Sequence, residues 1–280
     1  MKKILLSVLI LVLLLSGCGG EIKSDKVQVY TSFYAIEQFA KEIAGDRADV
    51  ISLIPSGSEP HGYEPTANDI KNLMTADLFI YNGNGMEHWS EDFIETVSEG
   101  NARVIEVSNG MPTVLEKSDP HSWLDVDNAL YAMEMVKNEL KALDRENALY
   151  YEENYKKAVE KAESLRQDFN NTSGGTIVVT HGAYGYLCDE MNIEQLSLEG
   201  IMGDGEPTPS DIVNAAKTIK EKGIKYIFAE KYGTDKVAKS LAEEVGAEIL
   251  ELDAFERGDG SNGYFEVMEE NISNIKLALE

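Results

Sequence analysis

Residues 128–170 read NALYAMEMVKNELKALDRENALYYEENYKKAVEKAESLRQDFN, a charged stretch rich in Ala, Leu and Glu that contains no Gly or Pro. This composition predicts helix, and we expect two helical segments that are broken near Asp144. The second segment, from about Arg145 to Asn170, would be roughly 39 Å long at about 1.5 Å per residue. A helix of that length between two globular halves is a stiff connection, unlike a flexible linker.

Strand-length apolar runs lie on both sides of this stretch. They are residues 27–32, 50–54, 77–81 and 102–107 in the first half and 176–180, 193–198, 224–230 and 248–252 in the second. Helical patterns lie between them, and such alternation predicts parallel-type sheets covered by helices. The expected fold class is therefore α/β. We expect two similar βα lobes at 27–127 and 173–280, joined by rigid interlobe helices over 128–172.

The start of the chain, residues 1–17, resembles a bacterial lipoprotein signal peptide. Two lysines precede an aliphatic run from Ile4 to Leu15, which is too short to span a bilayer comfortably. Cys18 follows Leu-Ser-Gly, so we expect it to be the lipidated first residue of the mature protein, with a tether over 18–26. A cleaved secretory signal with an incidental cysteine is the alternative. The expected location is the extracytoplasmic face of a cell membrane, on a surface of the Gram-positive type.

The net charge and the cysteine content argue against several kinds of partner and against stabilisation by a disulfide. The chain carries a formal net charge of −25, and removing Lys2 and Lys3 with the signal leaves −27. This acidity disfavours nucleic acid and unaided binding to anionic lipid. Acylation of Cys18 leaves Cys188 as the remaining thiol, so no disulfide forms within the chain and stability must come from a core. We expect a monomer that does not bind nucleic acid.

Three of the four histidines lie in polar motifs, SEPHGYEP around His61, DPHSW around His121 and VVTHGAYGY around His181. His61 and His181 follow predicted strands, and Asp253 comes directly after the strand 248–252. In open α/β sheets, ligands bind in the crevice outside the carboxyl ends of the strands. The loop of His121 enters the first interlobe helix and reaches the same cleft. Three imidazoles and one carboxylate would form a closed Zn²⁺-type site.

Other polar residues near these motifs leave alternatives open. A lone histidine in a loop is more often solvated or hydrogen-bonded than a ligand, and His88 fits a helix start, so we predict that it does not ligate. Asp259 and Glu256 are alternatives to Asp253 as the carboxylate ligand, and the strand-end argument favours Asp253. Glu59, in the first histidine motif, is a candidate to orient or supplement the site.

Four motifs, in order, resemble those of the zinc- and manganese-specific solute-binding lipoproteins of bacterial ABC importers, the TroA-like family. They are SEPHGYEPT, DPHSWLD, THGAYGYL and ELDAF followed by GYFEVMEENI, and the resemblance covers essentially the whole mature chain. It implies an ion held between two lobes by His61, His121, His181 and Asp253. It also implies that the ion is then handed to a membrane permease.

The resemblance leaves the metal open between zinc and manganese, or iron. Zinc importers of the family often carry a long His- and Asp-rich loop before the second ligand motif, and residues 116–119 leave no room for one here. Manganese-selective relatives, however, often have Glu where this chain has His181. Three nitrogens and one carboxylate suit Zn²⁺, which also stands above Mn²⁺ in the Irving–Williams order. We therefore expect zinc.

An enzyme and a metal-stabilised adhesin are the competing classes of function. Three histidines around Zn²⁺ also form a catalytic site when water holds the fourth position, with Glu59 as a base. The chain has no HExxH motif, and Asp253 would occupy the open position, so we predict that it is not an enzyme. Removing a structural metal would unfold an adhesin, whereas a carrier would stay folded.

Overall fold

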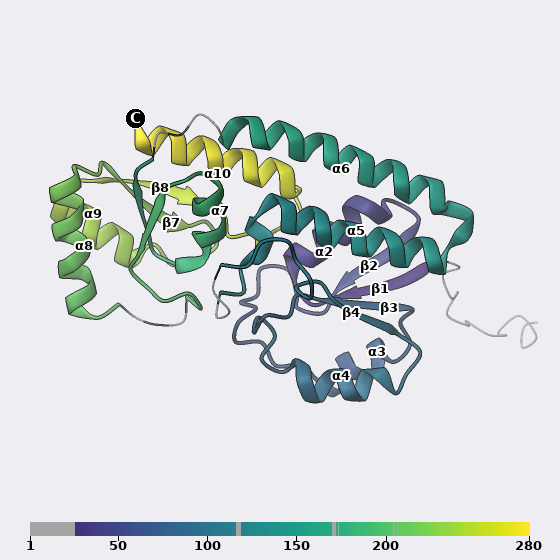
Figure 1. Ribbon diagram of the computed structural model, residues 1–280. Helices are drawn as coiled ribbons and strands as arrows, with labels where there is room; N and C mark the ends of the chain where they lie inside the picture. The colour runs from purple at the N-terminus through teal and green to yellow at the C-terminus, as the bar shows by residue number, and fades with distance from the viewer. Residues whose placement is uncertain (1–25, 116–118, 170–171, 173, 204, 206) are drawn as a thin grey trace, which may run out of the picture.

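The computed structural model describes residues 26–115, 119–169, 172, 174–203, 205 and 207–280. The predicted signal peptide, Cys18 and nearly all of the predicted tether lie outside the described residues. Two α/β lobes lie at opposite ends of the molecule and are joined by long helices that run along one side (Figure 1). In the described part of the chain, no helix is long and apolar enough to cross a membrane.

The N-terminal lobe is built on a four-stranded parallel sheet with the strand order β2-β1-β3-β4. The strands are β1 (Val27–Thr31), β2 (Ala48–Ser52), β3 (Leu78–Tyr81) and β4 (Arg103–Glu106), and the connecting helices are α2 (Tyr34–Ala44), α3 (Ala67–Leu73) and α4 (Ser90–Ser98). The chain moves outward from β1 to β2 and then crosses to the other side of β1. Loops at the carboxyl ends of β1 and β3 therefore flank a switch point, which is where open α/β sheets bind ligands.

The C-terminal lobe repeats this topology with the strand order β6-β5-β7-β8. Its strands are β5 (Thr176–Val179), β6 (Glu194–Ser197), β7 (Tyr226–Glu230) and β8 (Glu248–Leu252), and its helices are α7 (Gly185–Glu190), α8 (Pro209–Lys222), α9 (Lys236–Val245) and α10 (Tyr264–Leu279). α8 begins after a capping box formed by Thr208 and Asp211, and Gly223 ends it at φ 66°. The predicted fold class, two α/β lobes with parallel sheets, is confirmed.

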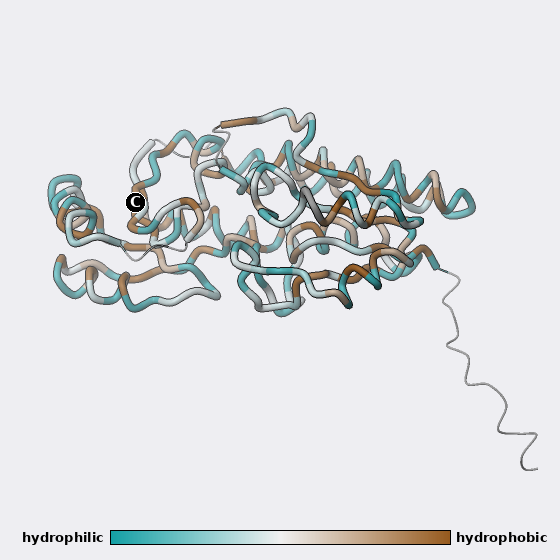
Figure 2. The backbone as a smooth tube through the Cα atoms, turned by 90° about the horizontal axis from the view of Figure 1, so that it is seen from below, coloured by the Kyte–Doolittle hydropathy of each residue, from teal (hydrophilic) through white to brown (hydrophobic). Residues whose placement is uncertain are grey.

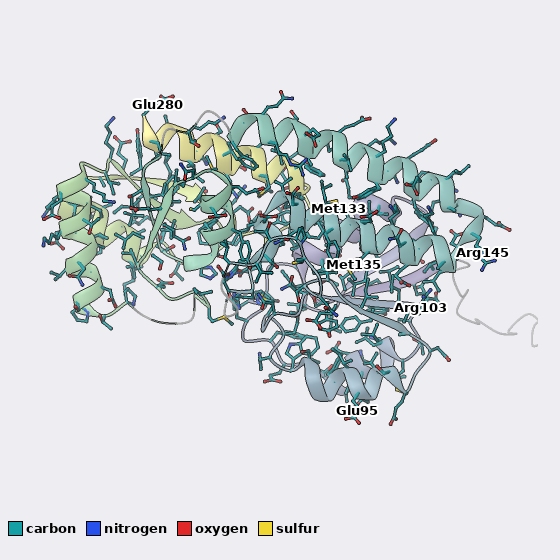
Figure 3. The ribbon with its side chains drawn as sticks, viewed as in Figure 1. Glu95, Arg103, Met133, Met135, Arg145 and Glu280 are labelled. Atoms are coloured by element: carbon teal, nitrogen blue, oxygen red, sulfur yellow. The ribbon has the colours of Figure 1, made fainter. Side chains whose placement is uncertain are left out.

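The stretch that opened the sequence folds as two helices, α5 (Val126–Leu143) and α6 (Ala148–Phe169), separated by a short 3₁₀ turn over Arg145–Asn147. The predicted break at Asp144 is confirmed, because its carboxylate accepts hydrogen bonds from Asn147 and from the Tyr151 hydroxyl at 2.7 Å. α6 folds back along α5 and packs against α2 and α10. Figure 3 shows Arg145 at the far end of this hairpin and Glu280 at the opposite end of the molecule.

One hydrophobic core runs through both lobes and the helices between them. It is a contiguous cluster that includes Val29, Ile36 and Phe39 of the N-terminal lobe, Val136 and Ala162 of the hairpin, and Val179, Phe228 and Ile275 of the C-terminal lobe. Figure 2 shows hydrophilic and hydrophobic residues alternating along the outer helices, as expected for helices that bury one face. A fully buried Val, Ile or Phe stabilises the fold by about 1.5–3 kcal/mol. The lobes are therefore held together by shared packing, while the exact lobe boundaries stay a prediction.

Candidate metal centre

Four buried side chains from separate loops meet between the lobes, namely those of His61, His121, His181 and Glu256. Each offers one possible ligand atom, and these atoms all lie within 4.8 Å of one another. His61 lies in the loop after β2, and His121 lies in the loop that enters α5. His181 comes two residues after the end of β5, and Glu256 comes four residues after the end of β8. Each lobe therefore contributes two of the four side chains.

The three imidazoles surround one oxygen of Glu256. Its Oε1 atom is 2.8 Å from His121 Nε2, 3.4 Å from His61 Nε2 and 4.0 Å from His181 Nδ1. In tetrahedral coordination, Zn²⁺ bonds of about 2.0–2.1 Å place neighbouring ligand atoms roughly 3.4 Å apart, so small side-chain shifts suffice. Among the described residues, Glu256 Oε2 and His61 Nδ1 are buried and have no hydrogen-bond partner. A buried cluster with such unpaired polar atoms fits a metal ion.

His121 is fixed by a network of hydrogen bonds within the N-terminal lobe. Its Nδ1 atom lies 2.8 Å from Asp119 Oδ1, which also accepts from the His121 backbone N–H at 3.0 Å. The Asn82 amide donates to the Pro120 carbonyl at 3.1 Å, and the backbone N–H of Asn82 donates to the buried Glu87 carboxylate at 2.9 Å. A carboxylate on Nδ1 orients a histidine so that Nε2 faces a metal. This network therefore aims His121 Nε2 at the centre.

His181 is held at both ring nitrogens. Nε2 is 2.7 Å from the Ile201 carbonyl oxygen, which can only accept a hydrogen bond, so Nε2 carries a proton and donates it to this bond. Nδ1 is 3.2 Å from Glu230 Oε2. Gly203 lies against the ring, where a side chain on it would approach His181 Cδ2 to 3.0 Å. Donation from Nε2 leaves the Nδ1 lone pair of a neutral His181 available for a metal.

The surrounding carboxylates raise the pKa of two of the three imidazoles, those of His121 and His181, and so favour their protonated forms in the metal-free centre. Burial lowers the pKa of His181, but Glu230 and Glu256 outweigh burial and raise this pKa to about 9. Burial acts in the same direction on His121, where Asp119 and Glu256 again leave the pKa above its ordinary value. Burial raises the pKa of Glu256, but His121 and the other histidines hold this pKa well below the ordinary range. A metal that binds here must therefore displace protons.

Asp253, the carboxylate favoured by the strand-end argument, lies outside this group of four. Its Oδ1 atom accepts a hydrogen bond from the Phe255 backbone N–H at 2.8 Å. Its backbone N–H donates to the Asn271 side-chain oxygen, and its backbone carbonyl accepts from the Asn271 side-chain amide. Phe255 has φ 59°, a conformation that is uncommon for any residue except glycine. The chain therefore turns sharply after Asp253, and it is Glu256 that faces the histidines.

The other residues considered from the sequence lie around the group. Glu59 Oε1 accepts from the His61 backbone N–H at 3.1 Å, so Glu59 orients the first histidine loop. His88 lies outside the group and pairs with exposed Glu64 at 2.9 Å. Asp259 also lies outside it, and its carboxylate accepts from the Ser261 backbone.

Two α/β lobes with a buried group of three histidines and one glutamate between them define a metal-binding protein. The chain belongs to the family described as zinc-uptake complex component A, periplasmic, whose model matches residues 29–278. The resemblance drawn from the four motifs is confirmed. The expected metal, zinc, is likewise borne out at the level of the family, whose relatives are named for zinc.

Curated relatives and solved structures agree on this family. The high-affinity zinc uptake system protein ZnuA of Bacillus subtilis is 31% identical, over 95% of this chain and 94% of that protein. The zinc-binding protein AdcA of Streptococcus pyogenes is 28% identical over 92% of this chain, which spans only 57% of AdcA. A structure of the laminin-binding protein of Streptococcus agalactiae, described as bifunctional with adhesin and metal-transporting activity, is 30% identical. It matches with a TM-score of 0.82 over 91% of this chain and 100% of that one. The Zn(II)-bound ZnuA-like domain of Streptococcus pneumoniae AdcA is 28% identical and matches with a TM-score of 0.80 over 91% of this chain and 99% of that one.

Proposed function

We propose that this chain is the extracytoplasmic zinc-binding protein of an ABC importer. It binds one Zn²⁺ through His61, His121, His181 and Glu256, in place of Asp253, and delivers the ion to a membrane permease. The observation that carries this proposal is the buried group of three histidines and one glutamate, drawn from both lobes. The names of the relatives, a zinc-uptake protein and a zinc-binding protein, support it.

The donor set favours zinc over manganese or iron and favours binding over catalysis. Three imidazole nitrogens and one carboxylate oxygen match a closed tetrahedral zinc shell, whereas Mn²⁺ prefers more oxygen. A catalytic zinc keeps one coordination position open for water. Four buried donors within 4.8 Å of one another fill that position, so the centre is suited to hold an ion as cargo.

Titration of the metal-free protein with Zn²⁺ is expected to show one tight site per chain, with Mn²⁺ binding at least tenfold more weakly. The His121→Ala variant should bind Zn²⁺ at least tenfold more weakly, about 1.4 kcal/mol, because it removes one donor of four. His88→Ala is the matched control, since this histidine pairs with Glu64 outside the group, and its Zn²⁺ affinity should stay that of the wild type. Unchanged binding by His121→Ala would remove that residue from the site.

We also propose that the protein is anchored to the membrane by acylation of Cys18 and acts as a monomer. The Cys18→Ala variant is expected to move from the membrane fraction to the soluble fraction, because several acyl chains together hold a protein firmly. Cys188→Ala is the control, because Cys188 is buried, and it should stay in the membrane fraction. Membrane association of Cys18→Ala after a high-salt wash, with mass analysis showing a cleaved signal, would contradict the anchor.

A further inference from the structure

An arginine joins the two lobes beside the candidate ligands. The Nη2 atom of Arg257 is 2.7 Å from Glu59 Oε2 and 3.2 Å from Glu230 Oε1. Glu59 belongs to the N-terminal lobe, and Glu230 is the last residue of β7 in the C-terminal lobe. The Nη1 atom of Arg257 also donates to the Tyr232 carbonyl at 3.3 Å, which anchors the guanidinium to the C-terminal lobe. One guanidinium therefore holds a carboxylate from each lobe.

Each of these carboxylates reaches a candidate ligand with its other oxygen. Glu59 Oε1 accepts from the His61 backbone N–H at 3.1 Å. Glu230 Oε2 lies 3.2 Å from His181 Nδ1. With a proton on His181 Nδ1, a continuous chain of polar contacts thus runs from His61 through Glu59, Arg257 and Glu230 to His181. Its two ends are candidate ligands from different lobes. A metal ion on Nδ1 replaces that proton, so the contacts that persist in the loaded protein are those from His61 through Glu59 and Arg257 to Glu230.

The two arms of this chain differ in their exposure to water. The side chains of Arg257 and Glu230 are 16% and 11% exposed, whereas that of Glu59 is 45% exposed. Charge-assisted hydrogen bonds are stronger where water is excluded, and exposed ion pairs are weak and screened by salt. The contact between Glu59 and Arg257 is therefore the arm that opens more easily.

We propose that Arg257 is a positioning residue that clasps the His61 loop of the N-terminal lobe to the C-terminal lobe and slows release of the bound ion. The ion leaves after the arm between Glu59 and Arg257 breaks and frees the His61 loop. This inference rests on the proposed function and adds to it a control over the dissociation rate. The Arg257 side chain contacts Glu59, Glu230 and Tyr232, none of which is a candidate ligand. Its loss therefore leaves the four donors in place and affects dissociation more than association.

The test measures Zn²⁺ dissociation by stopped-flow mixing of the loaded protein with an excess of a fluorescent chelator. Arg257→Gln, which breaks both arms, is expected to raise the dissociation rate about tenfold, and Glu59→Gln, which breaks the exposed arm alone, about threefold. Both variants should change the association rate less than twofold. The double variant should be no faster than Arg257→Gln alone, because both substitutions break the same contact. Arg257→Lys should fall between the wild type and Arg257→Gln, since an ammonium keeps the charge without the forked geometry.

The two single variants separate a clasp from a simple effect of charge. Removing the Arg257 cation would, by charge alone, bind Zn²⁺ more tightly, whereas removing the Glu59 anion would weaken binding. A clasp predicts that both variants release the ion faster. Slower or unchanged release from Arg257→Gln therefore overturns the proposal. If Arg257→Gln fails to fold by circular dichroism, Arg257→Lys decides, because it keeps the positive charge and loses the forked contact. Release of the ion at the wild-type rate from Arg257→Lys would then overturn the proposal.

Lys276→Gln is the matched control variant. It removes an ion pair of 3.0 Å with Asp168 that joins α10 to α6 at another place, and it should release Zn²⁺ at the wild-type rate. Wild-type protein that does not retain Zn²⁺ would overturn the proposed function and the clasp with it. Wild-type protein that holds Zn²⁺, with unchanged release from Arg257→Gln and Glu59→Gln, would overturn the clasp alone.

Discussion

The Glu256→Gln variant is expected to bind Zn²⁺ at least a hundredfold more weakly than the wild type, a change of about 2.8 kcal/mol. Its amide removes the charge from the oxygen that three imidazoles surround at 2.8, 3.4 and 4.0 Å. Asp253→Asn should stay within tenfold of the wild type, because an amide oxygen can still accept from the Phe255 backbone N–H. Competition against a chelator of known affinity, at constant pH, measures both variants.

A third variant tests what Asp253 does. Asp253→Ala removes the acceptor that supports φ 59° at Phe255, so it should weaken Zn²⁺ binding even though Asp253 lies outside the proposed group of ligands. If Asp253→Asn keeps its Zn²⁺ affinity and Asp253→Ala loses affinity, Asp253 is a residue that shapes the loop. The opposite outcome, in which Asp253→Asn binds Zn²⁺ far more weakly and Glu256→Gln binds it as the wild type does, would make Asp253 the fourth ligand.

Zn²⁺ affinity is expected to fall by about tenfold or more for each pH unit between pH 9 and pH 6, and so by about a thousandfold over that range. The metal-free protein holds a proton on His181 below a pKa of about 9, and this proton must leave before Nδ1 binds the metal. His121, whose pKa is also raised, adds to the dependence. Calorimetry in buffers of different ionisation enthalpy would count the protons released.

The same proton has the opposite effect on the metal-free fold. Because the pKa of His181 is raised in the folded state, its contribution to stability is complete below the unfolded value of about 6.5 and is lost as pH rises through about 9. Metal-free protein should therefore lose stability over the window in which Zn²⁺ affinity grows. Zn²⁺ affinity that stayed constant from pH 9 to pH 6 would be incompatible with a centre built on these histidines.

Both lobes and the group of three histidines could be predicted from the sequence, because each depends on patterns within short stretches of the chain. Apolar runs bounded by turns gave the strands, and the strand-end rule placed His61 and His181 at one edge. The helical hairpin was predicted only in part. Composition indicates helix but not the partner, and the return of α6 along α5 depends on which face becomes buried.

Glu256 was considered and ranked below Asp253 for a physical reason. The strand-end rule places the residue directly after β8 but does not give the direction of the chain beyond it. That direction is set by φ 59° at Phe255, whose ring is packed at 5.1 Å from Tyr34 and 5.5 Å from Tyr264. Tyr34 lies more than two hundred residues away in the sequence, so no local pattern contains this contact. Glu230 and Arg257 were missed because they act through contacts between segments far apart in the sequence, Glu230 with His181 within the C-terminal lobe and Arg257 with Glu59 across the lobes.

The core shared by both lobes changes what a permease can recognise. The cluster runs from α2 through α5 and α6 to α10, so wide separation of the lobes would divide a buried core that they share. We therefore expect the loaded and empty forms to have nearly the same outline. An empty carrier would then compete with a loaded one for the same docking place. Under the proposed function, the permease would then distinguish the two forms by the conformation of the few loops around the ion, and not by a separation of the lobes.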